Sequence, residues 1–130
     1  MQYYINPNQM NESTILIIDD EPEILNLLSR VLQMQGFLVR VAHTLSEGIR
    51  ELVVAEPAVL FLDINLPDGN GLQKLKELRK KFPTVKIIMI SALDSTEDRK
   101  KALENGAHTF LSKPFNLRQV SSLVHQFKKG

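Results

Sequence analysis

The chain has 130 residues, which is the size of a single domain. Its 16 basic and 15 acidic residues give a formal net charge of +1, and a hydrophobic share of 43% is ordinary for a globular domain, so composition offers no argument for nucleic-acid or membrane binding. The absence of cysteine excludes disulfides, thiolate catalysis and thiolate metal sites.

Residues 1–13 are polar, and we expect a loosely ordered N-terminal arm there, followed by one domain over residues 14–130. Within that domain, short apolar runs alternate with stretches whose apolar residues recur at helical spacing. Five apolar runs are typical of strands buried on both faces, and they cover residues 14–18, 37–42, 58–62, 85–90 and 109–111. Five amphipathic helices are predicted after these runs, beginning near Pro22, Leu45, Leu72, Thr96 and Leu117.

Proline, glycine and charged residues mark the segments between these elements. Pro22 suits the first turn of a helix, and Asp20 or Glu21 is expected to cap that helix. The stretch 66–71 is predicted to be a loop, because Pro, Gly and Asn dominate it. The basic run 79–81 is interpreted as the solvated end of the third helix.

A strand followed by a helix, repeated five times, predicts an α/β fold with a parallel sheet, helices on both faces and right-handed crossovers. We expect a single doubly wound (βα)5 domain of the flavodoxin-like kind. Its five-stranded parallel sheet should have the order 2-1-3-4-5.

Polar residues follow four of the five predicted strands. Asp19 and Asp20 follow the first strand, Asp63 the third and Ser91 the fourth, while Lys113 comes just after the fifth. The carboxyl ends of parallel strands in such a sheet converge on one crevice, where ligands bind. Three carboxylates, a hydroxyl and an ammonium group are therefore expected to meet there.

Carboxylates in such a cluster repel one another, by about 4 kcal/mol for a pair 4 Å apart at an effective dielectric near 20. The cluster must therefore hold a proton or a cation. Oxygen ligands suit Mg²⁺, with Mn²⁺ as an alternative. Mg²⁺ typically binds one or two carboxylates directly, which fits direct contacts from Asp20 and Asp63, with Asp19 acting through water.

Asp63 also lies where a carboxylate could attack phosphorus as a nucleophile. A bound cation would neutralise the charge shared by that carboxylate and the incoming phosphoryl group. Lys113 would add a second positive charge, and the Ser91 hydroxyl would donate to a phosphoryl oxygen.

Four motifs in order resemble the receiver domain of two-component response regulators, a family that includes the chemotaxis regulators. The resemblance extends over residues 14–129, and the motifs are 17–22 (IIDDEP), 62–71 (LDINLPDGNG), 90–92 (ISA) and 110–115 (FLSKPF).

This resemblance implies a role for each residue of the cluster. Asp63 would be the phosphoacceptor, taking a phosphoryl group from a phosphohistidine on a sensor kinase. The Mg²⁺ ligands would be Asp20, Asp63 and the carbonyl of Asn65, with Asp19 assisting.

The resemblance also implies a switch. Ser91 would move toward the phosphoryl group, Phe110 would then change rotamer, and the Lys113–Pro114 peptide would be cis, with Pro114 in a structural role. Because Phe110 replaces the commoner tyrosine, its signal would rest on packing alone. We expect phosphorylation to repack the surface of the fourth helix, fifth strand and fifth helix, since the fourth helix has few apolar residues.

The implied partners are a sensor histidine kinase or phosphotransfer protein and a downstream output protein or domain. We expect no direct nucleic-acid binding by this segment, no membrane association, a cytoplasmic location and a monomer or weak dimer. The predicted helices leave no room for an output domain, so the chain is interpreted as either a stand-alone receiver or a fragment of a longer regulator.

The favoured hypothesis is a phosphoacceptor signalling domain rather than an enzyme, although it would assist its own phosphorylation and slow dephosphorylation. One alternative is a phosphatase of the haloacid-dehalogenase type, but Asn65 occupies the position of the second aspartate of that family. Another alternative is a flavin- or nucleotide-binding domain, but the acidic run 19–21 would repel phosphate. A third is a receiver-like module that binds partners without phosphorylation; the presence of Asp63, Ser91 and Lys113 disfavours it.

Overall fold

The computed structural model describes residues 14–92 and 95–127. The expected N-terminal arm over residues 1–13 and the last three residues of the expected domain lie outside the described residues. Among the helices that are described, none is long and apolar enough to cross a membrane.

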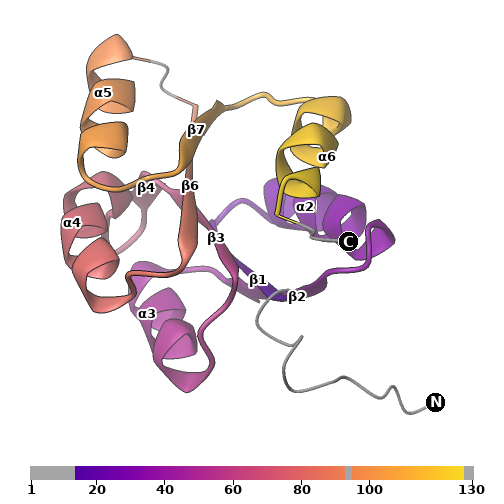
Figure 1. Ribbon diagram of the computed structural model, residues 1–130, viewed down its shortest axis with the longest axis horizontal. Helices are drawn as coiled ribbons and strands as arrows, with labels where there is room; N and C mark the ends of the chain where they lie inside the picture. Colours follow the sequence, from indigo (N-terminus) through magenta and orange to yellow (C-terminus); the bar gives the residue numbers. More distant parts are fainter. Residues whose placement is uncertain (1–13, 93–94, 128–130) are drawn as a thin grey trace.

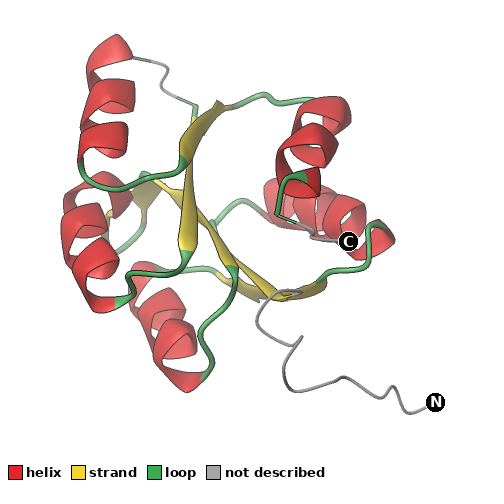
Figure 2. Cartoon of the chain, viewed as in Figure 1, coloured by secondary structure: helices red, strands yellow, loops and turns green. Residues whose placement is uncertain are grey.

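One parallel sheet forms the centre of the molecule (Figures 1 and 2). Its strand order is β2-β1-β3-β6-β7, which is the predicted order 2-1-3-4-5 when the five long strands are counted along the chain. The bounds of the five strands are β1 (Thr14–Ile18), β2 (Leu38–Ala42), β3 (Val59–Asp63), β6 (Lys86–Ser91) and β7 (Thr109–Ser112).

Five helices cover both faces of this sheet, as the doubly wound fold requires. Figure 1 shows α2 and α6 on one face and α3, α4 and α5 on the other. Their bounds are α2 (Pro22–Met34), α3 (Leu45–Val54), α4 (Gly71–Lys81), α5 (Thr96–Glu104) and α6 (Leu117–His125). The predicted flavodoxin-like α/β fold is therefore confirmed.

Side chains of the central strands alternate between two hydrophobic cores. In β1, Leu16 and Ile18 belong to the core under α3, α4 and α5, whereas Ile15 and Ile17 belong to the core under α2 and α6. Because both faces are covered, the strands have continuous apolar runs rather than alternating ones. These two cores hold the strand ends in fixed positions.

Two local predictions are corrected by the structure. The stretch 66–71 is not a simple loop, since β4 (Asn65–Leu66) and β5 (Gly69–Asn70) pair as a short antiparallel hairpin. Neither Asp20 nor Glu21 caps α2 with its side chain: Glu21 is the N-cap residue but makes no side-chain cap bond, and its N–H donates to Asp19 Oδ1 at 2.8 Å. Pro22 at the first helical position needs no acceptor for an N–H, which explains why α2 can begin without such a cap.

Candidate functional site

The register of the sheet brings the polar strand ends to one edge. Asp63 is paired with Ile90, and Ser91 is paired with Ser112, the residue before Lys113. The N–H of Asp19 donates to Ala42 O at 3.1 Å, just beyond the paired residues of β1 and β2. The predicted convergence of Asp19, Asp63, Ser91 and Lys113 is therefore present in the structure.

Three carboxylates form a cluster at this edge. Asp19, Asp20 and Asp63 each offer a carboxylate oxygen, and these oxygens lie within 4.8 Å of one another. Asp19 is fully buried and Asp63 is 3% exposed, whereas Asp20 is exposed to solvent. The cluster therefore has a buried floor and an open side.

Lys113 is the cation that faces this cluster. Its Nζ lies 2.9 Å from Asp19 Oδ2, 3.2 Å from Asp63 Oδ2 and 2.6 Å from Glu21 Oε1. Burial lowers the pKa of the Lys113 ammonium, but its contacts with the Glu21 and Asp19 carboxylates and the charges of Asp63 and Asp19 outweigh this effect, so its pKa is raised. Lys113 therefore stays charged, with its side chain 7% exposed.

The contact from Glu21 was missed by sequence reasoning, which assigned this side chain a capping role. The position of Glu21 directly after Asp19 and Asp20 was the sequence signal from which its contact with Lys113 could have been predicted. Glu21 directly precedes α2 and Lys113 directly follows β7, and the ion pair between them brings the start of that helix to the end of that strand.

The positive charge of Lys113 does not fully offset the effects of burial and of the Asp19 charge on the Asp63 carboxylate. Burial, followed by the charge of Asp19, raises the pKa of Asp63 to about 6, while Lys113 and the N–H of Asn65, 3.3 Å from Asp63 Oδ1, act in the opposite direction. One ammonium group therefore does not balance the three carboxylates in contact with it.

The residues present fit a divalent cation. Asp19 Oδ2 is buried and has no hydrogen-bond partner among the described residues, so its contact with Lys113 is an ion pair without hydrogen-bond geometry. The donors are carboxylate oxygens with solvent access beside Asp20, which is the ligand chemistry of Mg²⁺ and Mn²⁺. Asn65 opens the hairpin two residues after Asp63, so its carbonyl belongs to the same segment.

The two expected switch residues lie on neighbouring strands. Ser91 is buried at the end of β6, and Phe110 in β7 is 7% exposed. The guanidinium of Arg99 in α5 lies 5.0 Å from the centre of the Phe110 ring, and its Nη2 donates to Ser112 Oγ at 2.6 Å. Phe110 therefore points inward beneath Arg99, a contact that sequence reasoning did not anticipate.

The turn after β7 has the expected backbone. The Lys113–Pro114 peptide is cis, and the N–H of Lys113 donates to Ser91 O at 2.7 Å. Lys113 is thus tied to the end of β6 through its backbone as well as to the carboxylates through its side chain.

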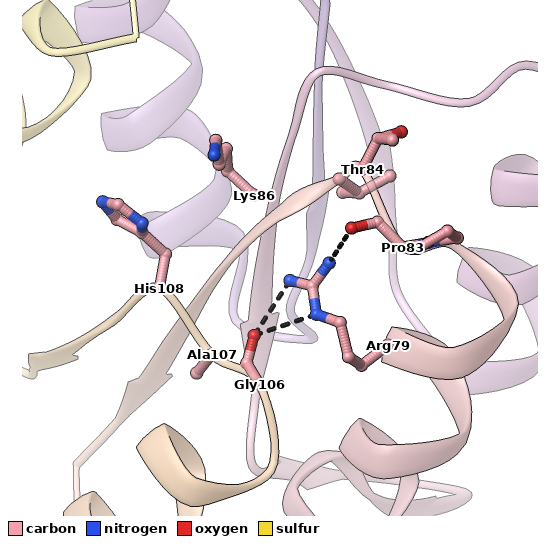
Figure 3. A pocket seen from close by; sticks show the side chains of 8 residues that line it. Arg79, Pro83, Thr84, Lys86, Gly106, Ala107 and His108 are labelled. Carbon is pink, nitrogen blue, oxygen red and sulfur yellow. Dashed lines mark hydrogen bonds between the residues drawn. The ribbon is translucent and has the colours of Figure 1, made fainter.

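A second feature lies at the other end of the sheet, where a pocket of about 480 Å³ opens beside the first residue of β6, Lys86 (Figure 3). Arg79 lines this pocket, and its guanidinium donates to the backbone carbonyls of Phe82, Pro83 and Gly106 at 2.9–3.2 Å. Burial lowers the pKa of Arg79. The interpretation of Arg79 as part of a solvated helix end is therefore wrong.

A family model for the response regulator receiver domain matches residues 15–125. Among curated relatives, the transcriptional regulatory protein CpxR of Klebsiella pneumoniae is 43% identical over 112 residues, which cover 85% of this chain and 47% of that protein. The regulator TrcR of Mycobacterium tuberculosis is 38% identical over 106 residues, 82% of this chain and 41% of that protein. The chain thus spans about half the length of the curated relatives it matches.

Solved structures of receiver domains match most of this chain. A CheY-like receiver domain protein from Methanospirillum hungatei is 31% identical with a TM-score of 0.83, and the match covers 88% of this chain and 91% of that one. The beryllofluoride-activated NtrC4 receiver domain, solved as a dimer, is 29% identical with a TM-score of 0.84, covering 88% and 95% of the two chains.

Proposed function

Because the chain belongs to the receiver domain family of two-component response regulators, we propose that it is a phosphoacceptor domain in which Asp63 receives a phosphoryl group from a sensor kinase phosphohistidine. The observation that carries this proposal is the position of the Asp63 carboxylate. It lies at the floor of the crevice, within 4.8 Å of the other two carboxylates and 3.2 Å from Lys113 Nζ.

In the transfer step, a carboxylate oxygen of Asp63 attacks phosphorus. The phosphorus–nitrogen bond of the donor breaks, its electron pair returns to the imidazole nitrogen, and an acyl phosphate forms on Asp63. The carboxylate must be ionised to attack, and a pKa of about 6 leaves it mostly ionised at neutral pH. Lys113 is placed to pair with the transferred group, because its ammonium already contacts the same carboxylate.

Asp19, Asp20, Asp63 and the Asn65 carbonyl would hold Mg²⁺, with Mn²⁺ as a substitute. When bound, the cation supplies positive charge that offsets the carboxylates and the oxygens of the phosphoryl group. The buried oxygen of Asp19, which lacks a hydrogen-bond partner among the described residues, and the raised pKa of Asp63 support this assignment, since a cation would coordinate the first and stabilise the ionised form of the second.

Ser91 and Phe110 would form the switch, and the surface of α5, β7 and α6 would carry the output. Weak packing of α5 supports this proposal: Ala102 is the buried residue of that described helix, and Leu103 is 54% exposed. If amide chemical shifts on this surface stay unchanged when beryllofluoride and Mg²⁺ are added, the switch is elsewhere.

A sensor histidine kinase or phosphotransfer protein would supply the phosphoryl group, and an output domain or protein would read the switch. The curated relatives CpxR and KdpE are transcriptional regulatory proteins, which supports an output that acts on transcription. We place the receiver domain over residues 14–130 in the cytoplasm, as a monomer or weak dimer that does not itself bind nucleic acid or membranes.

A stoichiometric switch and a phosphatase differ in turnover. With acetyl phosphate and Mg²⁺, the chain should accept at most one phosphoryl group per molecule, and chelation of Mg²⁺ should abolish the transfer. A generic phosphate ester should not be turned over, since Asn65 offers no carboxylate as a second acid–base group. Continuous release of phosphate from the ester would contradict the proposal and favour the phosphatase.

A further inference from the structure

The tip of the β4–β5 hairpin is bonded to a helix that lies far from it in sequence. Asp68, in the hairpin turn, accepts hydrogen bonds from the N–H of Leu45 at 2.7 Å and the N–H of Ser46 at 2.9 Å. These are the first two residues of α3. Such N–H groups have no acceptor within their own helix, so Asp68 caps α3 from outside the local chain.

The carboxylate and the hairpin backbone both contact this helix end. A Cβ atom added at Gly69 would lie 2.9 Å from Leu45 Cδ2, so the hairpin packs closely against the first residue of α3. The hydrogen bonds from Ser46 and Leu45 lower the pKa of Asp68, so its carboxylate is charged at neutral pH. A negative charge is also favourable beside the positive end of a helix.

The base of the same hairpin is fixed against the end of β3. The N–H of Gly71 donates to Ile64 O at 2.7 Å, and a Cβ atom at Gly71 would lie 2.2 Å from Asp63 O. Asn65, the first residue of the hairpin, donates its N–H to Asp63 Oδ1 at 3.3 Å. The hairpin that begins with Asn65 is therefore held at its base by Gly71 and at its tip by Asp68.

Asp68 contacts the start of α3, which follows β2 in the chain. The strand β2 pairs with β1, which ends just before Asp19 and Asp20. Ala42, at the end of β2, accepts the N–H of Asp19 at 3.1 Å. We propose that Asp68 is a positioning residue for the divalent cation site: it fixes the hairpin, and with it the Asn65 carbonyl, relative to Asp19 and Asp63. This inference rests on the metal site of the proposed function.

Thr44 provides a matched control, because it caps the same helix end from within the local chain. Its hydroxyl oxygen accepts the N–H of Glu47 at 3.1 Å and, among the described residues, makes no hydrogen bond to the hairpin. Removal of either cap should weaken α3, but removal of Asp68 alone should also release the hairpin. A role in helix stability and a role in positioning the metal site can therefore be separated.

The experiment titrates Mg²⁺ into the full chain and follows the amide chemical shifts of Asp20 and Asn65 in wild type, Asp68→Asn and Thr44→Ala. Asp68→Asn should raise the Mg²⁺ dissociation constant about tenfold, the lower end of what outer partners of metal ligands supply. Thr44→Ala should leave the dissociation constant unchanged while it lowers the melting temperature. In metal-free buffer, hydrogen exchange at Leu45 and Ser46 should accelerate in Asp68→Asn.

Asp68→Ala is a second variant: it removes both acceptor oxygens, whereas Asp68→Asn keeps one, so its dissociation constant should be at least as high as that of Asp68→Asn. Unchanged Mg²⁺ affinity in both Asp68 variants would overturn the inference, as would an equal loss of affinity in Thr44→Ala. A wild-type chain that binds no Mg²⁺ would instead overturn the metal site of the proposed function.

Discussion

At the scale of single residues, Lys113 and Asp63 show how burial and charge are balanced in the site. Lys113 contacts Asp19, Glu21 and Asp63 through one ammonium group. The buried carboxylate of Asp63 nevertheless has a pKa of about 6, so its ionised form is disfavoured by the folded protein. A buried carboxylate of this kind is disfavoured in its ionised form and is stabilised by an added cation.

Asp63→Asn should stabilise the metal-free protein at neutral pH. The unfolded carboxyl has a pKa of 3.8 and the folded one about 6, so the wild type loses stability as the pH rises between these values. Asparagine removes that loss, and the variant should be more stable by about 1–2 kcal/mol at pH 7.5, allowing for solvent screening. Urea unfolding in a chelating buffer checks this, with the difference vanishing near pH 4. A less stable variant at pH 7.5 would refute the charge imbalance.

Lys113→Ala should have the opposite effect on metal-free stability. Its loss leaves Asp19 and Asp63 without their cation, and breaking a buried pair in this way costs about 3 kcal/mol. Because Mg²⁺ can replace the missing charge, the rise in melting temperature on adding Mg²⁺ should be larger in the variant than in wild type. Lys74→Ala, which removes an exposed ion pair with Glu77, is the control and should change neither quantity. Equal Mg²⁺ effects in Lys113→Ala and wild type would count against a cation beside Lys113.

At the scale of elements, the strands deliver functional side chains to one edge, and this much could be predicted from sequence. A polar residue directly after a buried apolar run can lie only at a strand end, which located Asp19, Asp63 and Ser91. The hairpin at 65–70 could not be predicted, because two-residue strands leave no periodic pattern and the same Pro, Gly and Asn residues occur in loops.

Long charged side chains were also beyond prediction, for a different physical reason. Arg79 and Arg99 are spaced along their helices as solvated residues would be. Their partners are set by how distant elements pack: Arg79 bonds Gly106, and Arg99 covers Phe110. The sign and spacing of charges along one helix carry no information on these contacts.

Arg79→Lys should destabilise the fold without changing the site. Lysine cannot reproduce the planar guanidinium that joins the end of α4 to the loop before β7, so we expect a loss of about 2 kcal/mol in the free energy of unfolding. Lys80→Ala, at the exposed neighbouring position, should have little effect. Chemical denaturation measures both. Equal stability of Arg79→Lys and wild type would support the interpretation of Arg79 as a solvated surface residue.

At the scale of the whole molecule, the sheet separates structural and chemical roles between its two ends. The carboxylates and Lys113 meet at the carboxyl edge, while Arg79 joins α4 to the loop before β7 at the other edge (Figure 3). Between these two ends, a hydrophobic core packs against each face of the sheet, and the two cores make the sheet a rigid frame. The weakly packed α5 beside β7 is the part of this frame that we propose responds when Asp63 is phosphorylated.

The proposed function depends on phosphorylation of Asp63, and peptide mapping locates the phosphorylated residue. The full chain is treated with acetyl phosphate and Mg²⁺, the acyl phosphate is trapped by chemical reduction, and the modified residue is located by mass spectrometry in wild type and Asp63→Asn. We expect modification at Asp63 in wild type and no modification in the variant. Equal modification of the variant, or trapping at Asp19 or Asp20 in wild type, would contradict it.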